Sequence, residues 1–178
     1  ENLINLIDIN VSNGTLTVSD NNKCKFLRSY KDEITISITI SDFKKLTYTG
    51  FNTLNFSEKI TLNELRIFQR EGAGEMNLDI EAGYLSVTIA SGYGNFNLKG
   101  SALGAYFLCN GNGYCDTRNF LVNGELYVDS KTQADMNINA NSSNFTATIH
   151  QDGNIKYFGE PETIIVNSIG GGQVIAAN

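Results

Sequence analysis

Apolar and polar residues alternate along most of this chain, and the alternation restarts in the same phase after each of six small residues. These small residues are separated by 20, 19, 21, 19 and 19 positions: Gly74, Gly94, Gly113, Ala134, Gly153 and Gly172. Two positions after each of them stands a mostly apolar column: Met76, Phe96, Cys115, Met136, Ile155 and Val174. Four positions after them stands another: Leu78, Leu98, Thr117, Ile138, Tyr157 and Ala176. Because alternate residues of a strand share a face, each segment is predicted to bury the same two columns.

A second alternating segment precedes most of these small residues. Its apolar positions are Leu65 and Ile67, then Leu85, Val87 and Ile89, then Leu126 and Val128, then Phe145, Ala147 and Ile149. Further turns are predicted between the two kinds of segment, at 81–83, 99–101, 122–124 and 159–161. One coil is therefore predicted to run strand, tight turn, strand and second turn.

A single strand cannot bury an apolar face, but a stack of equivalent strands can. The predicted fold class is thus all-β, a single-stranded β-helix (β-solenoid) with coils of about 20 residues and tight glycine turns. Glycine suits turns that need a positive φ or a close passage of two backbones. We expect at least two of a set of four glycines to have positive φ: Gly94, Gly113, Gly153 and Gly172.

The N-terminal quarter departs from the repeat. Residues 7–18 and 34–40 are predicted strands, and Asn13-Gly14 indicates a tight hairpin turn. Leu54 and Phe56 suggest an irregular first coil. No linker is apparent, so we expect one domain over 1–178, with N-terminal strands and a cap in 1–45 and coils in 46–178. The other end of the stack, near residue 174, has no evident cap, which favours chain-end association or a further segment.

Composition and charge limit the function classes. The chain is 41% hydrophobic and 18% charged, which is typical of a folded domain. A net charge of −6 with no basic stripe argues against a nucleic-acid partner. No apolar run approaches the roughly 20 residues that span a bilayer. Glu1 is not an initiator Met, so we expect a processed or trimmed chain.

The chain has three cysteines, an odd number that leaves at least one unpaired within a monomer, so they do not make a disulfide framework. Cys109 and Cys115 flank a glycine turn and could form a disulfide bond. The simpler interpretation is that they are two small, partly buried hydrophobic residues. Cys24 would remain unpaired within a monomer in the first case.

The charged residues contain one candidate catalytic constellation. Asp79, Lys99 and Arg118 are predicted to share one outward column, five positions after successive turn residues, with Asp116 nearby. Such carboxylate and cation clusters serve β-helix lyases, which makes a polysaccharide-active enzyme, a lyase or hydrolase, the alternative function. The simpler interpretation is a solvated charge ladder between coils, in which each pair contributes little stability.

Other candidate side chains point to binding or to no function. Tyr93 and Tyr114 lie beside successive turns and could stack on sugars, or could be ordinary strand-end aromatic residues. His150 precedes a turn and is expected at the surface, without a nucleophile to serve. One polar column suits hydrogen bonding to a glycan or protein, plain solvation, or an Asn ladder: Asn77, Asn97, Asp116 and Asn137.

The sequence resembles the family of autotransporter adhesin head domains, or GIN domains, common in Bacteroidetes. The resemblance begins at the NGTLTV strand (13–18) and ITISITISDFKKLTYTG (34–50). It continues through the Gly-x-Gly coils and ends with DGNIKYFGEPETIIVNSIGGGQVI (152–175), its most specific part. It implies a β-helix, export to the cell envelope or surface, and a role in adhesion. The family has no accepted catalytic set, so the resemblance supplies no catalytic, cofactor-binding or metal-ligating residue.

The expected function is therefore a non-catalytic domain of the cell surface, outer membrane or periplasm. We expect it to need no cofactor and to bind a surface ligand, either a glycan or a protein, or to assemble with further copies through its ends or faces. The outer faces of a solenoid are extended and rigid, which suits recognition.

Overall fold

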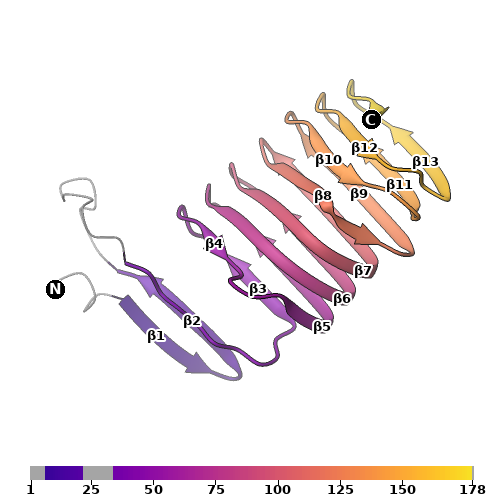
Figure 1. Ribbon diagram of the computed structural model, residues 1–178. Coiled ribbons are helices and arrows are strands. Elements are labelled where there is room, and N and C mark those ends of the chain that lie inside the picture. The colour runs from indigo at the N-terminus through magenta and orange to yellow at the C-terminus, as the bar shows by residue number, and fades with distance from the viewer. Residues whose placement is uncertain (1–6, 22–33, 178) are drawn as a thin grey trace. The chain divides into compact units, whose positions relative to one another are not determined.

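Parallel ladders join most strands of the computed structural model, which describes residues 7–21 and 34–177 (Figure 1). The chain forms two compact units, Glu1–Ile40 and Ser41–Asn178. Cys24 lies outside the described residues.

The first unit contains an antiparallel hairpin of β1 (Ile7–Ser12) and β2 (Thr15–Asp20). Asn13 and Gly14 form its two-residue turn, with φ of 50° and 73°. Two consecutive positive φ values match the twist of the flanking strands, and Asn and Gly tolerate them better than other residues. The predicted hairpin is confirmed.

The strand predicted at 34–40 is wrong. Residues 34–40 have no strand assignment, and Ile38 is 52% exposed. Alternating β-branched residues favour an extended backbone, but a strand also needs a neighbouring chain to pair its N–H and C=O groups. No ladder among the described residues includes this segment.

The second unit is a solenoid in which every ladder is parallel. Its strands are β3 (Lys45–Tyr48), β4 (Leu54–Asn55), β5 (Ile60–Gln69), β6 (Glu75–Ile89), β7 (Asn95–Gly111), β8 (Tyr114–Val122), β9 (Glu125–Thr132), β10 (Met136–Asn139), β11 (Asn144–Ile149), β12 (Ile155–Phe158), β13 (Thr163–Ser168) and β14 (Val174–Ala176). The coils stack in chain order from β3 to β14 (Figure 1).

The coils present two walls, which we call the first face and the second face. The first face contains β4, the beginnings of β6 and β7, and then β8, β10, β12 and β14. The second face contains β3, β5, the ends of β6 and β7, and then β9, β11 and β13. The predicted β-solenoid with coils of about 20 residues is confirmed.

The core is the inward stack that the repeat predicts. Its first column is fully buried at Met76, Phe96, Cys115, Met136 and Ile155. Ladder partners such as Met76 and Phe96 lie directly beside each other. Val174 is only partly buried, since β14 is the last strand of its wall. The phenyl rings of Phe96 and Phe120 lie 5.9 and 6.1 Å from that of Phe107, so aromatic contacts connect two neighbouring coils.

Two of the four predicted second turns are wrong. Residues 81–83 and 99–101 lie within β6 and β7, where the chain bends while its ladder continues, as at the Ile80–Gly100 and Glu81–Ser101 pairs. A bend costs little if its hydrogen bonds persist, and Gly100 absorbs it with a φ of 112°. The other two predicted turns do separate strands, at residues 123–124 and 159–161.

The expectation of positive φ at the four selected glycines is also wrong. Gly94, Gly113, Gly153 and Gly172 are absent from the positive-φ residues of the structure. The reason for glycine there is space: a Cβ on Gly153 would lie 2.3 Å from the carbonyl oxygen of Ala134. The turn residues thus mark places where neighbouring coils pass closely.

Candidate functional site

An Asn ladder runs along the outward side of the first face. Asn77 donates from Nδ2 to Oδ1 of Asn55 at 3.0 Å, and Asn97 donates from Nδ2 to Oδ1 of Asn77 at 2.9 Å. Ladder pairing brings the next members of the predicted column, Asp116 and Asn137, into register with them. Because the amides bond to each other across coils, this part of the column stabilises the stack.

At Asp116 the amide-to-amide hydrogen bonds of the Asn ladder end. Arg118 donates from Nη2 to Oδ2 of Asp116 at 2.5 Å, and its backbone N–H donates to Oδ1 at 3.0 Å. Burial alone would raise the pKa of Asp116, but the hydrogen bonds and charge of Arg118 outweigh it, so the pKa lies below its usual value. Asn137 donates from Nδ2 to the Tyr114 hydroxyl at 2.7 Å. The side chains of this column are therefore engaged, Asn77 and Asn97 with each other, Asp116 with Arg118, and Asn137 with Tyr114.

The predicted column of Asp79, Lys99 and Arg118 is only partly formed. Lys99 Nζ lies 3.0 Å from Asp79 Oδ2. A register shift after Asn97 places Asn119, and not Arg118, opposite Lys99. The extra residue of a bulge has no ladder partner, so Arg118 leaves the column, pairs with Asp116 and lies 5.8 Å from the Phe158 ring. The result is two separate ion pairs, one between coils and one within β8, and only the first matches the predicted charge ladder between coils.

Tyr93 and Tyr114, the two tyrosines beside successive turns, do not form a common surface for stacking on a sugar. Tyr93 is 66% exposed beside its turn. Tyr114 is partly buried and pairs in the ladder with Asn95. Burial is the main reason that the pKa of Tyr114 is raised. These side chains lack the common register that stacking on one ligand requires.

Cys109 and Cys115 are both free and fully buried. The disulfide alternative is therefore not realised, and burial raises the pKa of the Cys115 thiol. His150 is partly exposed at the start of a turn, and its Nε2 lies 3.0 Å from Oδ1 of Asp129.

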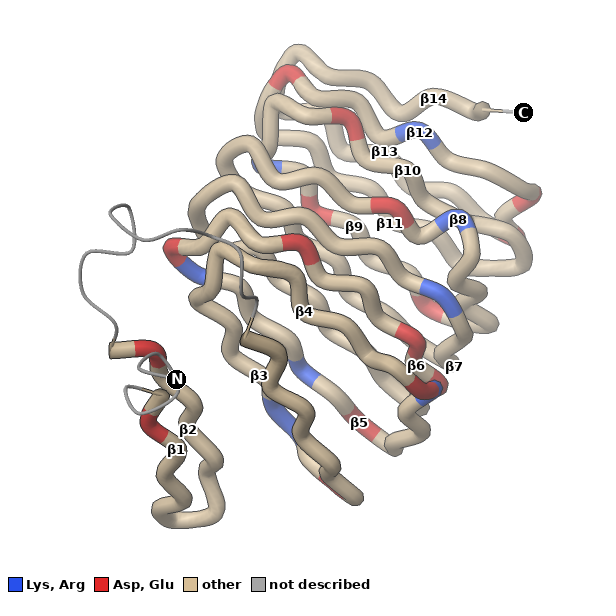
Figure 2. The backbone as a smooth tube through the Cα atoms, turned by 60° about the vertical axis from the view of Figure 1, so that its left-hand side comes forward, with Lys and Arg blue, Asp and Glu red and all other residues tan. Residues whose placement is uncertain are grey.

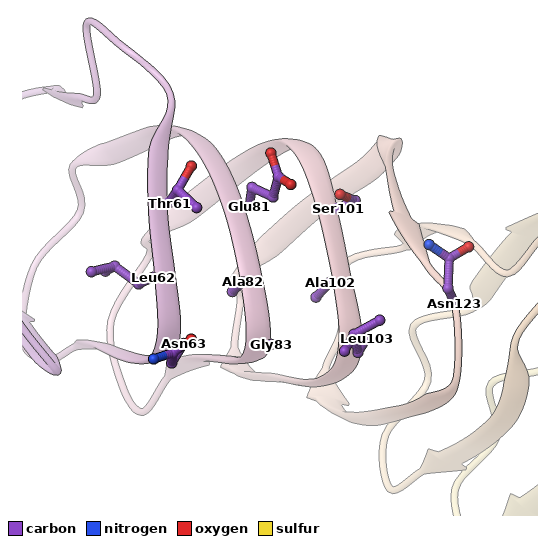
Figure 3. A pocket seen from close by; sticks show the side chains of 10 residues that line it. All are labelled: Thr61, Leu62, Asn63, Glu81, Ala82, Gly83, Ser101, Ala102, Leu103 and Asn123. Atoms are coloured by element: carbon purple, nitrogen blue, oxygen red, sulfur yellow. The ribbon is translucent and has the colours of Figure 1, made fainter.

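A groove of about 430 Å³ lies at the bends of successive coils. Figure 3 shows its walls as rows across neighbouring coils, one with Thr61, Glu81 and Ser101 and another with Leu62, Ala82 and Ala102. Glu81 is the one titratable side chain among its lining residues, and it lies 4.0 Å from Lys59 Nζ. Acid–base catalysis requires two titratable groups or a metal in such a hollow, and this groove supplies one paired carboxylate.

The second face carries a cluster that the sequence did not indicate. Tyr84 and Tyr127 are 39% and 45% exposed, and Tyr106 is partly buried between them. Tyr106 and Tyr127 are ladder partners, so their side chains leave the sheet side by side. The Tyr84 ring lies over Gly104, where an added Cβ would be 3.5 Å from Cδ2. We call Tyr84, Tyr106 and Tyr127 the tyrosine cluster.

Carboxylates hold two hydroxyls of the tyrosine cluster. Tyr127 donates to Glu125 Oε2 at 3.2 Å, and Tyr106 donates to Asp129 Oδ2 at 3.3 Å. Burial, the Asp129 carboxylate and the neighbouring Tyr84 raise the pKa of Tyr106 to about 12. Acidic and basic positions are interspersed along the coils (Figure 2).

The tyrosine cluster escaped the repeat analysis because its members stand 10, 12 and 14 positions after Gly74, Gly94 and Gly113. The length between tight turn and second strand differs from coil to coil. Counting from the buried residues of the second strand would have aligned Tyr106, after Ala105, with Tyr127, after Leu126. Tyr84, before Leu85, would still have fallen one column away.

Residues 1–161 match the family model described as "Putative auto-transporter adhesin, head GIN domain". The chain belongs to this GIN-domain family. A crystal structure of a putative adhesin from Bacteroides fragilis is similar to this GIN domain, with a TM-score of 0.84 and 27% sequence identity. The match covers 97% of this chain and 77% of that chain. No curated protein matches the GIN domain.

Within residues 7–21 and 34–177, no helix has the length and apolar character of a membrane span. Over the same residues, no three His, Cys, Asp or Glu side chains are grouped so that they could hold a metal ion.

Proposed function

We propose that this GIN domain is a non-catalytic adhesin head, exported and displayed at the cell surface, outer membrane or periplasm, that binds a surface partner through an outer face of its solenoid. Its family and the Bacteroides fragilis neighbour, both described as adhesins, support this proposal. Family and structural similarity do not identify the partner, so the outward side chains of this chain are the basis for inferring it.

The observation that carries the proposal is the fixed register of outward side chains on both faces. Parallel pairing holds the same outward position of successive coils side by side, as at Asn77 and Asn97 or at Tyr106 and Tyr127. Neighbouring strands are about 4.8 Å apart, so these rows offer regularly spaced contacts on a rigid support. A rigid surface binds with little loss of its own conformational entropy.

The carboxylates of the first face support binding over turnover. Asp79 is paired with Lys99, and Asp116 with Arg118, within 3.0 Å in each case. A lyase or hydrolase needs a titratable group that is available to the substrate and matched in pKa to its task. Arg118 holds the pKa of Asp116 below its usual value, which opposes a role as a general acid near neutral pH.

The test combines binding with turnover. Purified residues 1–178 are applied to arrays of glycans and surface proteins, and separately incubated with acidic and neutral polysaccharides with calcium present. We expect saturable binding to an array partner and unchanged polysaccharide length. Chain shortening that disappears in Asp116→Ala or Lys99→Ala, but persists in the exposed control Lys59→Ala, would overturn the proposal in favour of a polysaccharide-active enzyme. Absence of binding to every array member would overturn it as well.

A further inference from the structure

The tyrosine cluster places exposed aromatic area on the outward side of the second face. Tyr84 and Tyr127 together offer two rings that are 39% and 45% exposed on coils two rungs apart. Strand spacing, together with the two-residue offset between their columns, puts their positions on the wall about 12 Å from each other. Exposed aromatic side chains with a polar tip are enriched at recognition sites, because the ring supplies contact area and loses little entropy on binding.

The rings are held before any ligand arrives. Tyr127 is fixed at its hydroxyl by Glu125, whose second oxygen accepts a hydrogen bond from Asn144 Nδ2 at 3.0 Å. Tyr106 is fixed by Asp129, which also contacts Lys131 Nζ at 3.4 Å. Such second contacts restrict the side chains to one arrangement, which lowers the entropic cost of binding.

Gly104 creates the space in which the cluster forms. It stands between Tyr84 and Glu125 in one outward row of the second face. A side chain larger than alanine at this position would compete with the Tyr84 ring, since an added Cβ would already lie in contact with it. An aromatic surface is thereby combined with a carboxylate and an amide, Glu125 and Asn144, on the neighbouring coils.

We propose that the tyrosine cluster and its flanking residues Glu125 and Asn144 bind a neutral glycan. The C–H face of a pyranose ring is apolar and packs on an aromatic ring, whereas its equatorial hydroxyls are hydrogen-bond donors and acceptors. Tyr84 and Tyr127 supply the rings. Glu125 accepts hydrogen bonds from sugar hydroxyls, and charge-assisted bonds of this kind are stronger than neutral ones. Asn144 both donates and accepts.

Charge favours a neutral glycan over an acidic one. Glu125 has hydrogen bonds from Tyr127 and Asn144 but no ion-pair partner within 4.0 Å among the described residues. Among the cations of this wall, Arg66 pairs with Glu64 and Lys131 with Asp129. Lys45 of β3 lies over the Phe68 ring. A uronate or sialate carboxylate would therefore meet an uncompensated negative charge.

This proposal rests on the proposed adhesin function. The test uses residues 1–178 with neutral oligosaccharides of β-glucan, mannan and galactan. Oligosaccharides of polygalacturonate and alginate serve as acidic counterparts. Binding is measured by calorimetry and by perturbation of NMR signals. Tyr127→Ala and Tyr84→Ala each remove a ring, whereas Tyr127→Phe keeps the ring and loses the hydroxyl. Tyr93→Ala removes a more exposed tyrosine that lies at a turn.

We expect weak binding of a neutral oligosaccharide that falls at least about tenfold in Tyr127→Ala and Tyr84→Ala. Tyr127→Phe should retain more affinity than Tyr127→Ala, and Tyr93→Ala should stay within about twofold of the unmodified chain. Unchanged melting temperatures in the variants would show that the loss comes from the binding surface.

Other outcomes separate the two proposals. Glycan binding that survives both alanine variants would overturn the assignment of the site and leave the adhesin proposal standing. Preference for the acidic oligosaccharides would overturn the argument from charge. If the chain binds a surface protein instead, and Tyr127→Ala abolishes that binding, the cluster is a protein interface and the glycan proposal is wrong. No binding of any partner would overturn both.

Discussion

The substitutions Gly153→Ala and Gly104→Ala add the same methyl group in two different surroundings. Neither glycine has a positive φ, so neither substitution forces a side chain into a left-handed backbone. At Gly153 the new Cβ would lie 2.3 Å from the Ala134 carbonyl oxygen and 2.7 Å from that of Thr132. At Gly104 its nearest neighbours would be Tyr84 Cδ2 at 3.5 Å and Glu125 O at 3.7 Å.

The expected magnitudes follow from these distances. Ordinary contact begins at about 3.4 Å, so Gly153→Ala requires adjacent coils to separate by about 1 Å. The two carbonyls cannot withdraw freely, since Thr132 O accepts the Gly153 N–H at 3.2 Å. Overpacking costs about 1–3 kcal/mol, and a weakened buried hydrogen bond about 1 kcal/mol. We expect Gly153→Ala to lower the free energy of unfolding by about 2–4 kcal/mol.

Gly104→Ala meets no such obstacle. Alanine reduces the freedom of the unfolded chain, so it should change the free energy of unfolding by no more than about 1 kcal/mol, in the stabilising direction. Urea unfolding followed by far-ultraviolet circular dichroism, with thermal unfolding as a second measure, compares both variants with the unmodified chain. At about 2–4 °C per kcal/mol, the two melting temperatures should be clearly separated. Equal stability of the two variants would refute the argument that turn glycines are required by close passage of the coils.

Three further outcomes are expected. Met136→Asp should destabilise the chain by several kcal/mol because an unpaired charge enters the core, whereas Met136→Leu should cost less than about 1.5 kcal/mol; similar urea midpoints would contradict the inward stack. Lys156 holds the pKa of Asp135 below its usual value, so this carboxylate stabilises the fold above about pH 4, and the stabilisation is lost as pH falls through the lower folded-state pKa. Asp135→Asn should therefore lose less stability on acidification than the unmodified chain. Parallel plots of unfolding free energy against pH for the two chains would count against this account. The exposed strand β13 ends its wall among the described residues, so we expect concentration-dependent association in sedimentation equilibrium that Ile165→Lys weakens; a strict monomer would refute it.

The repeat of the coils was readable because burial imposes the same requirement on every coil. An inward position of one strand lies beside the inward position of the next, so both must be apolar and in phase, as at Met136 and Ile155. The Asn13-Gly14 hairpin was readable because few residues tolerate its backbone. Residues 34–40 show the limit of such patterns, since alternation predicts an extended chain and cannot supply a neighbour for it.

The sequence by itself determined the solenoid, its coil length and the column that fills its core, because these depend on spacing along one chain. Only the tertiary structure decided which outward side chains meet. Contacts between coils depend on the number of residues in each bend and bulge. One extra residue in β8 moves Arg118 away from Lys99 and toward Asp116. The same variation hid the tyrosine cluster, because Tyr106 and Tyr127 stand at different distances from their turns and become neighbours only when parallel strands set the register.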